Sequence, residues 1–454
     1  MGREPVRCSA RRDSLNRPSP RGSAAGLRLL SRLASTRHLP LHRSFYALAL
    51  TTGANAALGL LFWVAAARLY PTHIVGLGAA GVSAVQLVAI VGWLGLEVTL
   101  IRYLPVAGPR RRRLLALVYA AGGRAALVTA GVFALFVAGA LEVPYVVSNS
   151  AAVVAFFGSV LIWVVFSLQD AALVGIRRAP LVPVENTIYA AVKLVLLVAL
   201  SAVAEPWTIL GVWFAPAAVA TVIVNGLLFR RLLSVQGREH SLPTATAVAR
   251  FSVGHTAVAV TGSLPDFLVP LLVLRFLGQD ANAYYYAAWA IGASVRLLSF
   301  NLANVLVAEA AYAEIAIGRL LRSATRLSFL FLVPVLLMLL LGASAVLRLF
   351  GAEYASEAAP LLRYLALSIV PFTVAAFAVA LDRIRERFAA ALTITGVGSA
   401  TVIGLNLVLL PSLGITGAGI AWLAGQGAAA VVAIAIVRLP LPSDTAGRPT
   451  RTSG

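Results

Sequence analysis

The chain has 454 residues, of which 60% are hydrophobic and 12% are charged, and its mean hydropathy is +0.89. So much apolar surface cannot be hidden in a soluble core, and apolar runs of about 20 residues are too long for the strands of a membrane β-barrel. The net charge of +20 is spread over short arginine clusters between these runs, as in membrane proteins, and not over a nucleic-acid-binding surface. We therefore expect an all-α polytopic membrane protein whose partners include the lipid bilayer and no nucleic acid.

The first apolar run is preceded by residues 1–43, which are rich in Arg, Ser and Pro and show little periodicity. Such a composition predicts a disordered basic tail. A cleaved signal peptide is disfavoured, because the apolar run is long and begins late. The single cysteine, Cys8, lies in this tail, so no intramolecular disulfide is expected. A second short tail is expected over residues 438–454.

Twelve membrane spans are predicted between the tails. Their approximate ranges are 44–69, 77–104, 115–141, 151–174, 184–203, 207–229, 251–274, 283–307, 327–349, 359–381, 388–410 and 416–437. The connecting segments alternate between arginine-rich and nearly arginine-free. Because cytoplasmic loops carry the excess of Lys and Arg, both termini are expected on the cytoplasmic side of the plasma (inner) membrane.

The second half of the chain weakly repeats the first. Aligning residues 68–70 with 275–277 brings the stretch 76–81 opposite 283–288 without a gap. Each half would then hold six spans that begin on the same side of the membrane. This predicts two six-helix lobes, residues 44–250 and 251–437, related as a parallel pseudo-repeat with a substrate cleft between them. Chance similarity between alanine-rich segments is the alternative.

Two spans of the second lobe each carry one ionisable residue deep in apolar sequence, Asp266 and Arg296. A charge near the centre of a bilayer span costs about 2.5–3.5 kcal/mol on insertion scales, so it usually faces a partner or a wet cavity. With a helical rise of about 1.5 Å per residue, the two lie roughly 13 and 20 Å below one membrane surface. A long arginine side chain spans that difference. We expect these residues to line the substrate cleft; a structural ion pair between two helices is the alternative.

Polar and aromatic residues share helical faces with these charges. The face of Asp266 also carries His255 and Ser263, and the face of Arg296 also carries Tyr285 and Trp289. These four residues are therefore candidates for the cleft. For His255, a polar helix end near the membrane surface is the alternative.

The first lobe supplies three more candidates. Glu97 and Arg124 lie at similar depths on neighbouring predicted spans and are a second candidate ion pair, and Arg102 is a candidate cation nearer the inner surface. For Arg102, snorkelling towards the interface is the alternative.

The sequence has no spacing typical of a metal site, no phosphate-binding loop and no recognisable nucleophile set. We therefore expect no metal, no cofactor, no ATP-driven cycle and no catalytic residues. The chain is not expected to be an enzyme.

Four segments resemble the polysaccharide transporter or oligosaccharide flippase family, which belongs to the multidrug/oligosaccharidyl-lipid/polysaccharide exporter superfamily. They are ARLYPTHIVGLGA, GLEVTLIRYLP, LRLFGAEYASEAAPLLRYLAL and LNLVLLPSLGITGAGIAWL, at residues 67–79, 95–105, 347–367 and 405–423. The last two are the most specific, as a Phe-Gly-x-x-Tyr turn and a Leu-Pro-x-x-Gly-Ile-x-Gly-Ala hairpin. The resemblance covers residues 44–437.

The resemblance implies a MATE-like fold and a flippase that moves a polyprenyl diphosphate sugar to the outer leaflet by alternating access, for cell-surface polysaccharide biosynthesis. Glycan polymerases and glycosyltransferases would then be partners. Physical chemistry agrees with such a cargo, since a diphosphate needs a cation such as Arg296 or Arg102, and sugar rings stack on aromatic faces such as Tyr285 and Trp289.

Two alternative functions remain. The first is an ion-coupled exporter of amphipathic cations on the same fold, for which an acidic site should dominate the cleft. The second is a membrane-embedded glycan polymerase or glycosyltransferase, which needs a sizeable catalytic loop that the predicted connections do not supply.

Overall fold

The computed structural model describes residues 40–93, 95–141, 143, 148–230, 245–312, 317–385 and 387–438. The predicted tails lie outside these residues, except that residues 40–43 begin the first described helix and Arg438 ends the last. The chain divides into two units, residues 1–48 and 49–454. Apart from the start of the first helix, everything below concerns the second unit.

The first half of the described chain is entirely helical between its turns. Its helices are α2 (Pro40–Leu69), α3 (Thr72–Trp93), α4 (Leu96–Tyr103), α5 (Arg111–Val132), α6 (Ser150–Gly175), α7 (Leu181–Ala199) and α8 (Pro206–Arg230). Two short 3₁₀ turns, Leu104–Val106 and Gly108–Arg110, connect α4 to α5, and a π-helical turn, Phe133–Val137, extends α5.

The second half contains four helical runs, two of which turn back on themselves. They are α9 (Ala245–Tyr312), α10 (Ile317–Leu347), α11 (Ala352–Ile384) and α12 (Phe388–Arg438). The run of α9 breaks at Gly278 (φ 83°), and that of α12 breaks at Gly414 (φ 60°). A positive φ strains any residue with a Cβ, so glycine is suited to both reversals. These are the turns that separate the predicted pairs of spans 251–274/283–307 and 388–410/416–437.

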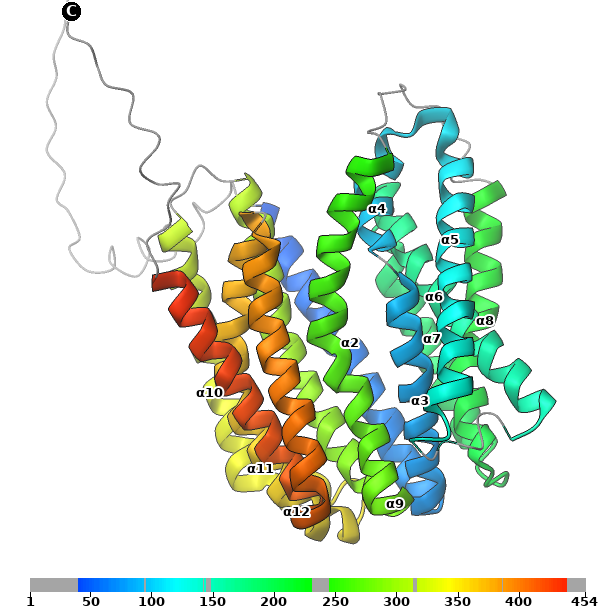
Figure 1. The fold of residues 1–454 in the computed structure, drawn as a ribbon, viewed down its shortest axis with the longest axis vertical. Helices are drawn as coiled ribbons and strands as arrows, with labels where there is room; N and C mark the ends of the chain where they lie inside the picture. Colours follow the sequence, from blue (N-terminus) through cyan, green and yellow to red (C-terminus); the bar gives the residue numbers. More distant parts are fainter. Residues whose placement is uncertain are drawn as a thin grey trace, which may run out of the picture. The chain divides into compact units, whose positions relative to one another are not determined.

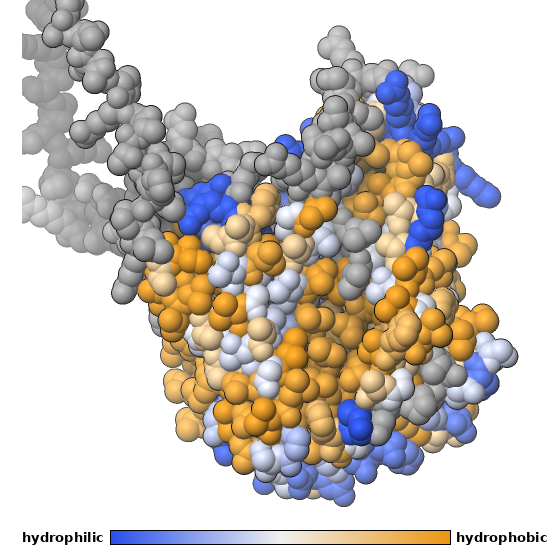
Figure 2. All heavy atoms as spheres, viewed as in Figure 1, coloured by the Kyte–Doolittle hydropathy of each residue, from blue (hydrophilic) through white to orange (hydrophobic). Residues whose placement is uncertain are grey.

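The number of membrane passes agrees with the prediction. Within the described residues, eight helical stretches are long and apolar enough to cross a membrane, and two of them, Val253–Asn301 and Phe388–Ile436, are 49 residues long and contain the breaks at Gly278 and Gly414. Counting each of these as two passes, and adding the shorter apolar helices Asn55–Leu69 and Leu332–Leu347, gives twelve. Figure 2 shows hydrophobic residues over the middle of one face and hydrophilic residues towards its ends.

One predicted span is wrong in its continuity. The range 77–104 was expected as a single helix, but the chain breaks between α3 and α4, where Gly95 has a left-handed φ of 67°. Hydropathy continues across this point and so gives no sign of the break. Its effect is to give α4, which carries Glu97 and Arg102, an orientation independent of α3.

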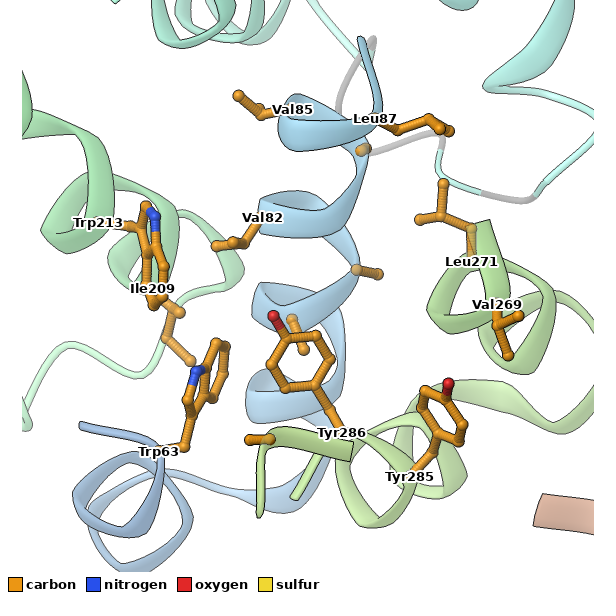
Figure 3. Close-up of a cluster of buried hydrophobic side chains, with 14 of the residues drawn as sticks. Trp63, Val82, Val85, Leu87, Ile209, Trp213, Val269, Leu271, Tyr285 and Tyr286 are labelled. Atoms are coloured by element: carbon orange, nitrogen blue, oxygen red, sulfur yellow. The ribbon is translucent and has the colours of Figure 1, made fainter. Parts of the chain in front are cut away.

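The helices form two groups that meet along α3 and α9. Helices α3, α5, α6 and α8 pack against one another, as do α9, α10, α11 and α12, and the main contact between the groups is that of α3 with α9 (Figure 1). Figure 3 shows side chains from α2, α8 and α9 gathered around α3, among them Trp63, Trp213 and Tyr286. The central seam is therefore closely packed and aromatic. The predicted lobe boundary at residue 250 falls in the first turns of α9 and stays a prediction.

At one end of this seam the two groups approach closely, and side chains of each group donate hydrogen bonds to backbone carbonyls of the other. The Asn282 side-chain amide donates to the carbonyl of Gly76 at 2.7 Å, and Arg68 Nε donates to the carbonyl of Leu349 at 2.8 Å. A Cβ built on Gly76 would lie 1.8 Å from the carbonyl oxygen of Gln279, so only glycine allows this approach. We call these five residues the turn-end contact, because they lie at or near the connections between α2 and α3, between the two arms of α9 at Gly278, and between α10 and α11.

Replacing Gly76 with alanine is expected to destabilise the turn-end contact. The new methyl group must displace a backbone carbonyl, and such overpacking typically costs about 1–3 kcal/mol. The measurement is the thermal melting temperature of the purified protein in detergent. Gly131→Ala is the matched control, because nothing lies within 4 Å of a Cβ at Gly131, and its melting temperature should stay close to that of the wild type. Equal melting temperatures for the two variants would contradict the close approach.

Candidate functional site

A cavity of about 600 Å³ lies between the two helix groups. Residues of α2, α3 and α8 line it from the first group, and residues of α9, α11 and α12 line it from the second. Along α9 the lining ends at Phe267 and resumes at Tyr286. At about 1.5 Å per residue, these positions are roughly 16 and 12 Å from the Gly278 reversal. Packed side chains therefore separate the cavity from the turn-end contact.

Asp266 and Arg296 line the cavity and form an ion pair. An Arg296 terminal nitrogen donates to Asp266 Oδ1 at 2.6 Å. The side chain of Arg296 is 10% exposed, and that of Asp266 is 26% exposed. Trp289 Nε1 donates to the same Asp266 oxygen at 3.4 Å. The break at Gly278 folds α9 back on itself and brings the two charges together. The pair thus lines the space between the halves and also forms the ion pair that was the alternative, and a role of the two residues in binding substrate stays a prediction.

Two aromatic rings pack against the guanidinium of Arg296. Its central carbon lies 4.5 Å from the ring centroid of Trp422 and 5.8 Å from that of Phe372. Trp422 in turn donates its indole N–H to the hydroxyl of Tyr285 at 3.0 Å. Cation–π contacts of this kind strengthen as the cation loses water. Tyr285 is fully buried and does not line the cavity, so its place is in the wall that positions Arg296.

A row of four aromatic residues crosses the cavity from one helix group to the other. Consecutive ring centroids are 5.6 Å apart for Trp213 and Trp63, 4.5 Å for Trp63 and Tyr286, and 4.9 Å for Tyr286 and Trp289. All four line the cavity, and Figure 3 shows the first three converging beside α3. We call them the aromatic row. Trp63, Trp213 and Tyr286 are at most 9% exposed, so Trp289, which is half-buried, carries the most open ring of the row for a flat apolar or sugar-ring face.

Arg383, in the last turn of α11, is the other arginine that lines the cavity. Its Nε is buried and has no hydrogen-bond partner among the described residues. Its charge interacts with the carboxylate of Glu97 on α4, whose Oε2 is likewise buried without a partner. The two groups thus attract each other across the helix groups without a direct contact. Arg383 is a cation with unused donor capacity in the cavity wall.

The pairing predicted for Glu97 is wrong. Arg124 is exposed and donates from Nε to the carbonyl of Ala120 in its own helix at 3.0 Å, and the charge acting on Glu97 is that of Arg383. The break at Gly95 separates α4 from α3, and α4 then packs mainly against α6. Equal depth on neighbouring spans could not reveal this change in packing.

The remaining predicted site residues lie in different surroundings. Ser263 lines the cavity. His255 does not, and its ring packs edge-on against Phe388 at 4.8 Å. Arg102 is exposed outside the cavity, with its guanidinium 5.7 Å from the ring centroid of Tyr103. A substrate-binding role for any predicted site residue stays a prediction. The cavity gives it no support for five of them, which do not line it: His255, Arg102, Arg124, Glu97 and Tyr285.

A buried lysine packs against Trp213 of the aromatic row. Lys193 on α7 is 4% exposed, and its amine lies 3.5 Å from the ring centroid of Trp213 and 4.7 Å from that of Phe62. Tyr189, one turn earlier on α7, donates its hydroxyl to the backbone carbonyl of Trp213 at 3.0 Å. Trp213 is therefore fixed from the side that faces away from the cavity.

Several cavity residues have no clear signal in the sequence. Trp63, Trp213 and Tyr286 lie in apolar runs, where an aromatic residue is usually a core residue. Arg383 adjoins a predicted cytoplasmic loop, where arginine is common. One signal could have found it: Arg383 follows Asp382 directly at the end of a span, and two adjacent charges at a membrane boundary each need a separate partner.

No family model and no curated protein matches this sequence. Solved structures do match. An inward-facing MATE family multidrug resistance transporter of the MOP superfamily is 16% identical, with a TM-score of 0.64 over 86% of this chain and 94% of that chain. The lipid II flippase MurJ, in an inward closed conformation, is 10% identical, with a TM-score of 0.69 over 87% of this chain and 88% of that chain.

A third structure shows that the fold accommodates pockets of different charge. It is a MOP superfamily transporter from Pyrococcus furiosus Vc1 whose binding pocket is described as reversed in polarity. It is 13% identical, with a TM-score of 0.57 over 87% of this chain and 94% of that chain. At such identities the likeness shows the fold and leaves the cargo to be argued from the cavity. This chain is therefore an all-helical, multi-pass membrane protein that shares the twelve-helix, two-lobe fold of the MATE family transporter and of MurJ.

Proposed function

We propose that this protein is a flippase that carries a sugar-bearing lipid with a diphosphate group across the plasma membrane, by alternating access to the cavity between its two lobes. The cargo class is a polyprenyl diphosphate sugar used to build cell-surface polysaccharide. Glycosyltransferases that make this lipid and a polymerase that consumes it would be its functional partners.

The charge of the cavity wall is the observation that carries the proposal. The residues that line the cavity include one carboxylate, Asp266, and two guanidiniums, those of Arg296 and Arg383. Asp266 is already paired with Arg296, so the wall keeps one net positive charge. A diphosphate is attracted to such a wall, and guanidinium binds phosphate oxygens with charge-assisted hydrogen bonds.

The shape of the lining supports a sugar next to the diphosphate. The aromatic row supplies ring faces on which sugars stack, while the serine, threonine and glutamine side chains of the lining supply hydrogen bonds. Arg383 follows Phe372, which contacts Arg296, by eleven residues of α11, or roughly 16 Å of helix. Head group and sugar would therefore occupy different parts of one cavity, and the lipid tail could stay in the bilayer.

The position of the cavity supports loading from the cytoplasm. It lies away from the turn-end contact and extends to Arg383, next to the arginine-rich segment 383–387. If that segment is cytoplasmic, as the distribution of arginines predicts, the structure represents a state closed at the outer end. The orientation itself, with both termini inside, is part of the proposal.

The proposal predicts transport of a labelled cargo in a defined system. Purified protein is reconstituted in liposomes with a fluorescent polyprenyl diphosphate sugar, and its appearance in the opposite leaflet is followed by a membrane-impermeant quencher. We expect translocation well above that of protein-free liposomes. A protein that moves a cationic dye and leaves this lipid in place would instead be a cation exporter.

A cation exporter is the weaker candidate function, because of the charges in the cavity wall. The likeness to a MATE family transporter favours it, but such a cargo needs an acidic group that is free to bind it. The acid in the lining, Asp266, is occupied by Arg296. If this alternative holds, Arg296→Ala should spare or increase dye transport, whereas it should impair a flippase.

A further inference from the structure

Buried carboxylates occur in the first lobe at a distance from the cavity. Glu185 on α7 is 9% exposed, and Asp170 on α6 lies beside it and acts on it electrostatically. Glu185 Oε2 and Asp170 Oδ1 are both buried and accept no hydrogen bond from the described residues. Neither residue lines the cavity. Two buried carboxylates that act on each other and each keep one oxygen without a partner would be costly if both were charged.

A directed chain of hydrogen bonds reaches Glu185 through three other helices. The Tyr119 hydroxyl donates to Asn225 Oδ1 at 2.7 Å, and the Asn225 amide donates to Gln169 Oε1 at 2.6 Å. Gln169 then donates its own amide to Glu185 Oε1. The chain fixes the direction of the Gln169 amide and leaves Oε2 as the one open position on Glu185. On the other carboxylate, the Asn186 amide donates to Asp170 Oδ2 at 3.0 Å, which leaves Oδ1 open.

The charged groups of the surrounding helices do not compensate the pair. Lys193, two turns beyond Glu185 on α7, is engaged by the rings of Phe62, Tyr189 and Trp213. On α4, Glu97 interacts with Arg383.

The arginines nearest in sequence to Asp170 and Glu185 do not compensate the two carboxylates either. Arg177 and Arg178, which follow α6, are exposed, as is Arg102 on α4. From α5, the titratable group that faces the carboxylates is the phenol of Tyr119. Among the described residues, the pair therefore accepts hydrogen bonds from the amides of Gln169 and Asn186 and has no direct cationic partner.

We propose that Asp170 and Glu185 form a proton-binding site that holds one exchangeable proton between Oδ1 and Oε2. A proton removes one of the two charges and gives the pair a donor for an open oxygen. A hard metal cation fits poorly, because it needs about six oxygens, whereas the amide oxygens of Gln169 and Asn225 already accept hydrogen bonds. No group of three or more His, Cys, Asp or Glu side chains suited to a metal occurs in the described part of the chain.

The site is placed to exchange protons with one membrane surface and to affect the cavity. Asp170 is five residues before the end of α6, and Glu185 is four residues after the start of α7, so both lie about 6–8 Å inside the helix ends. The same buried face of α7 continues through Tyr189 to Lys193, which hold Trp213 of the aromatic row. Loading or release of the proton can thus act on the cavity wall through one rigid helix.

The test needs no cargo and detects the proton directly. Infrared spectra of the full chain in liposomes at neutral pH are compared between wild type and Asp170→Asn/Glu185→Gln, with and without deuterium exchange. We expect the wild type to show the C=O stretch of a protonated carboxyl group, and the double variant to lose that intensity. Both substitutions keep size and hydrogen-bonding capacity. Glu205→Gln, at an exposed position, is the matched control and should leave the band unchanged.

Two outcomes would overturn the proposal. The first is equal band intensity in the wild type and in the double variant, which would place any bound proton elsewhere. The second is loss of the wild-type band when sodium chloride replaces choline chloride at constant pH, because a cation would then occupy the site. The melting temperature provides a separate measurement. If folding retains the proton, stability falls as pH rises, and the double variant should show less of this fall than the Glu205→Gln control.

Discussion

Arg383→Gln is expected to weaken binding and transport of the polyprenyl diphosphate sugar by roughly 10- to 100-fold. A hydrogen bond to a charged group contributes about 1.5–3 kcal/mol, and each 1.4 kcal/mol corresponds to a factor of ten in affinity. Arg383 is the cation of the cavity wall without a direct ion-pair partner among the described residues, so its charge is available to the diphosphate. The measurements are the affinity for the fluorescent lipid in detergent and its translocation rate in liposomes.

The matched control is Arg385→Gln. Arg385 follows α11 by one residue, is exposed and does not line the cavity, so its loss changes the net charge of the segment and nothing in the wall. We expect its affinity and rate to stay within about twofold of the wild type, since exposed charge interactions contribute at most about 1 kcal/mol. An equal loss in both variants would show that the segment acts through bulk surface charge or orientation.

Glu97→Gln should change the affinity for the lipid in the opposite direction to Arg383→Gln. Glu97 attracts the guanidinium of Arg383 from α4 and so competes with an anionic cargo. Removing its charge is expected to strengthen lipid binding. If alternating access brings α4 and α11 together, the same variant should slow the closed-to-open step, so tighter binding should accompany slower transport. Tighter binding with faster transport would exclude a role for Glu97 in closure.

The parts of this molecule that follow from local sequence could be predicted, and the parts that depend on helix rotation could not. Twelve passes and the reversals at Gly278 and Gly414 follow from hydropathy and turn composition, which are local properties. Contact between Asp266 and Arg296 could be predicted because charges in apolar spans are rare and need partners. The wrong partner for Glu97 comes from Gly95, which redirects α4 with no change in hydropathy.

The same distinction explains the aromatic residues. Tyr285 and Tyr286 are adjacent in an apolar run, yet the ring of one is fully buried against Trp422 and the other lines the cavity. Adjacent residues point about 100° apart on a helix, so which of them faces the cleft depends on the rotation of α9 against its neighbours. Trp63 and Trp213 come from α2 and α8, which are distant in sequence, and become one surface only after these helices pack together within the first half.

Asp266→Ala is expected to lower the free energy of unfolding by about 3–5 kcal/mol, the cost typical of leaving a buried partner charge uncompensated. Arg296 cannot lose its proton, and its side chain is only 10% exposed, so the unpaired guanidinium would have to stay charged in the cavity wall. Arg296→Met should cost less, because Asp266 is the more exposed side chain of the pair and keeps the hydrogen bond from Trp289. Thermal melting in detergent measures both losses, with Ser294→Ala in the same lining as a control that should change little.

The double variant Asp266→Ala/Arg296→Met separates a structural ion pair from a binding site. It leaves no unpaired charge, and methionine can lie against Trp422 where the guanidinium lay, so its melting temperature should recover most of the loss caused by Asp266→Ala. If the pair only joined the two arms of α9, transport of the fluorescent lipid would recover as well. We expect a folded protein with transport reduced at least tenfold, because Arg296 and Asp266 would hydrogen-bond the sugar beside the aromatic row while Arg383 holds the diphosphate. Recovery of both stability and transport would reduce the pair to a structural link and leave Arg383 as the anionic site.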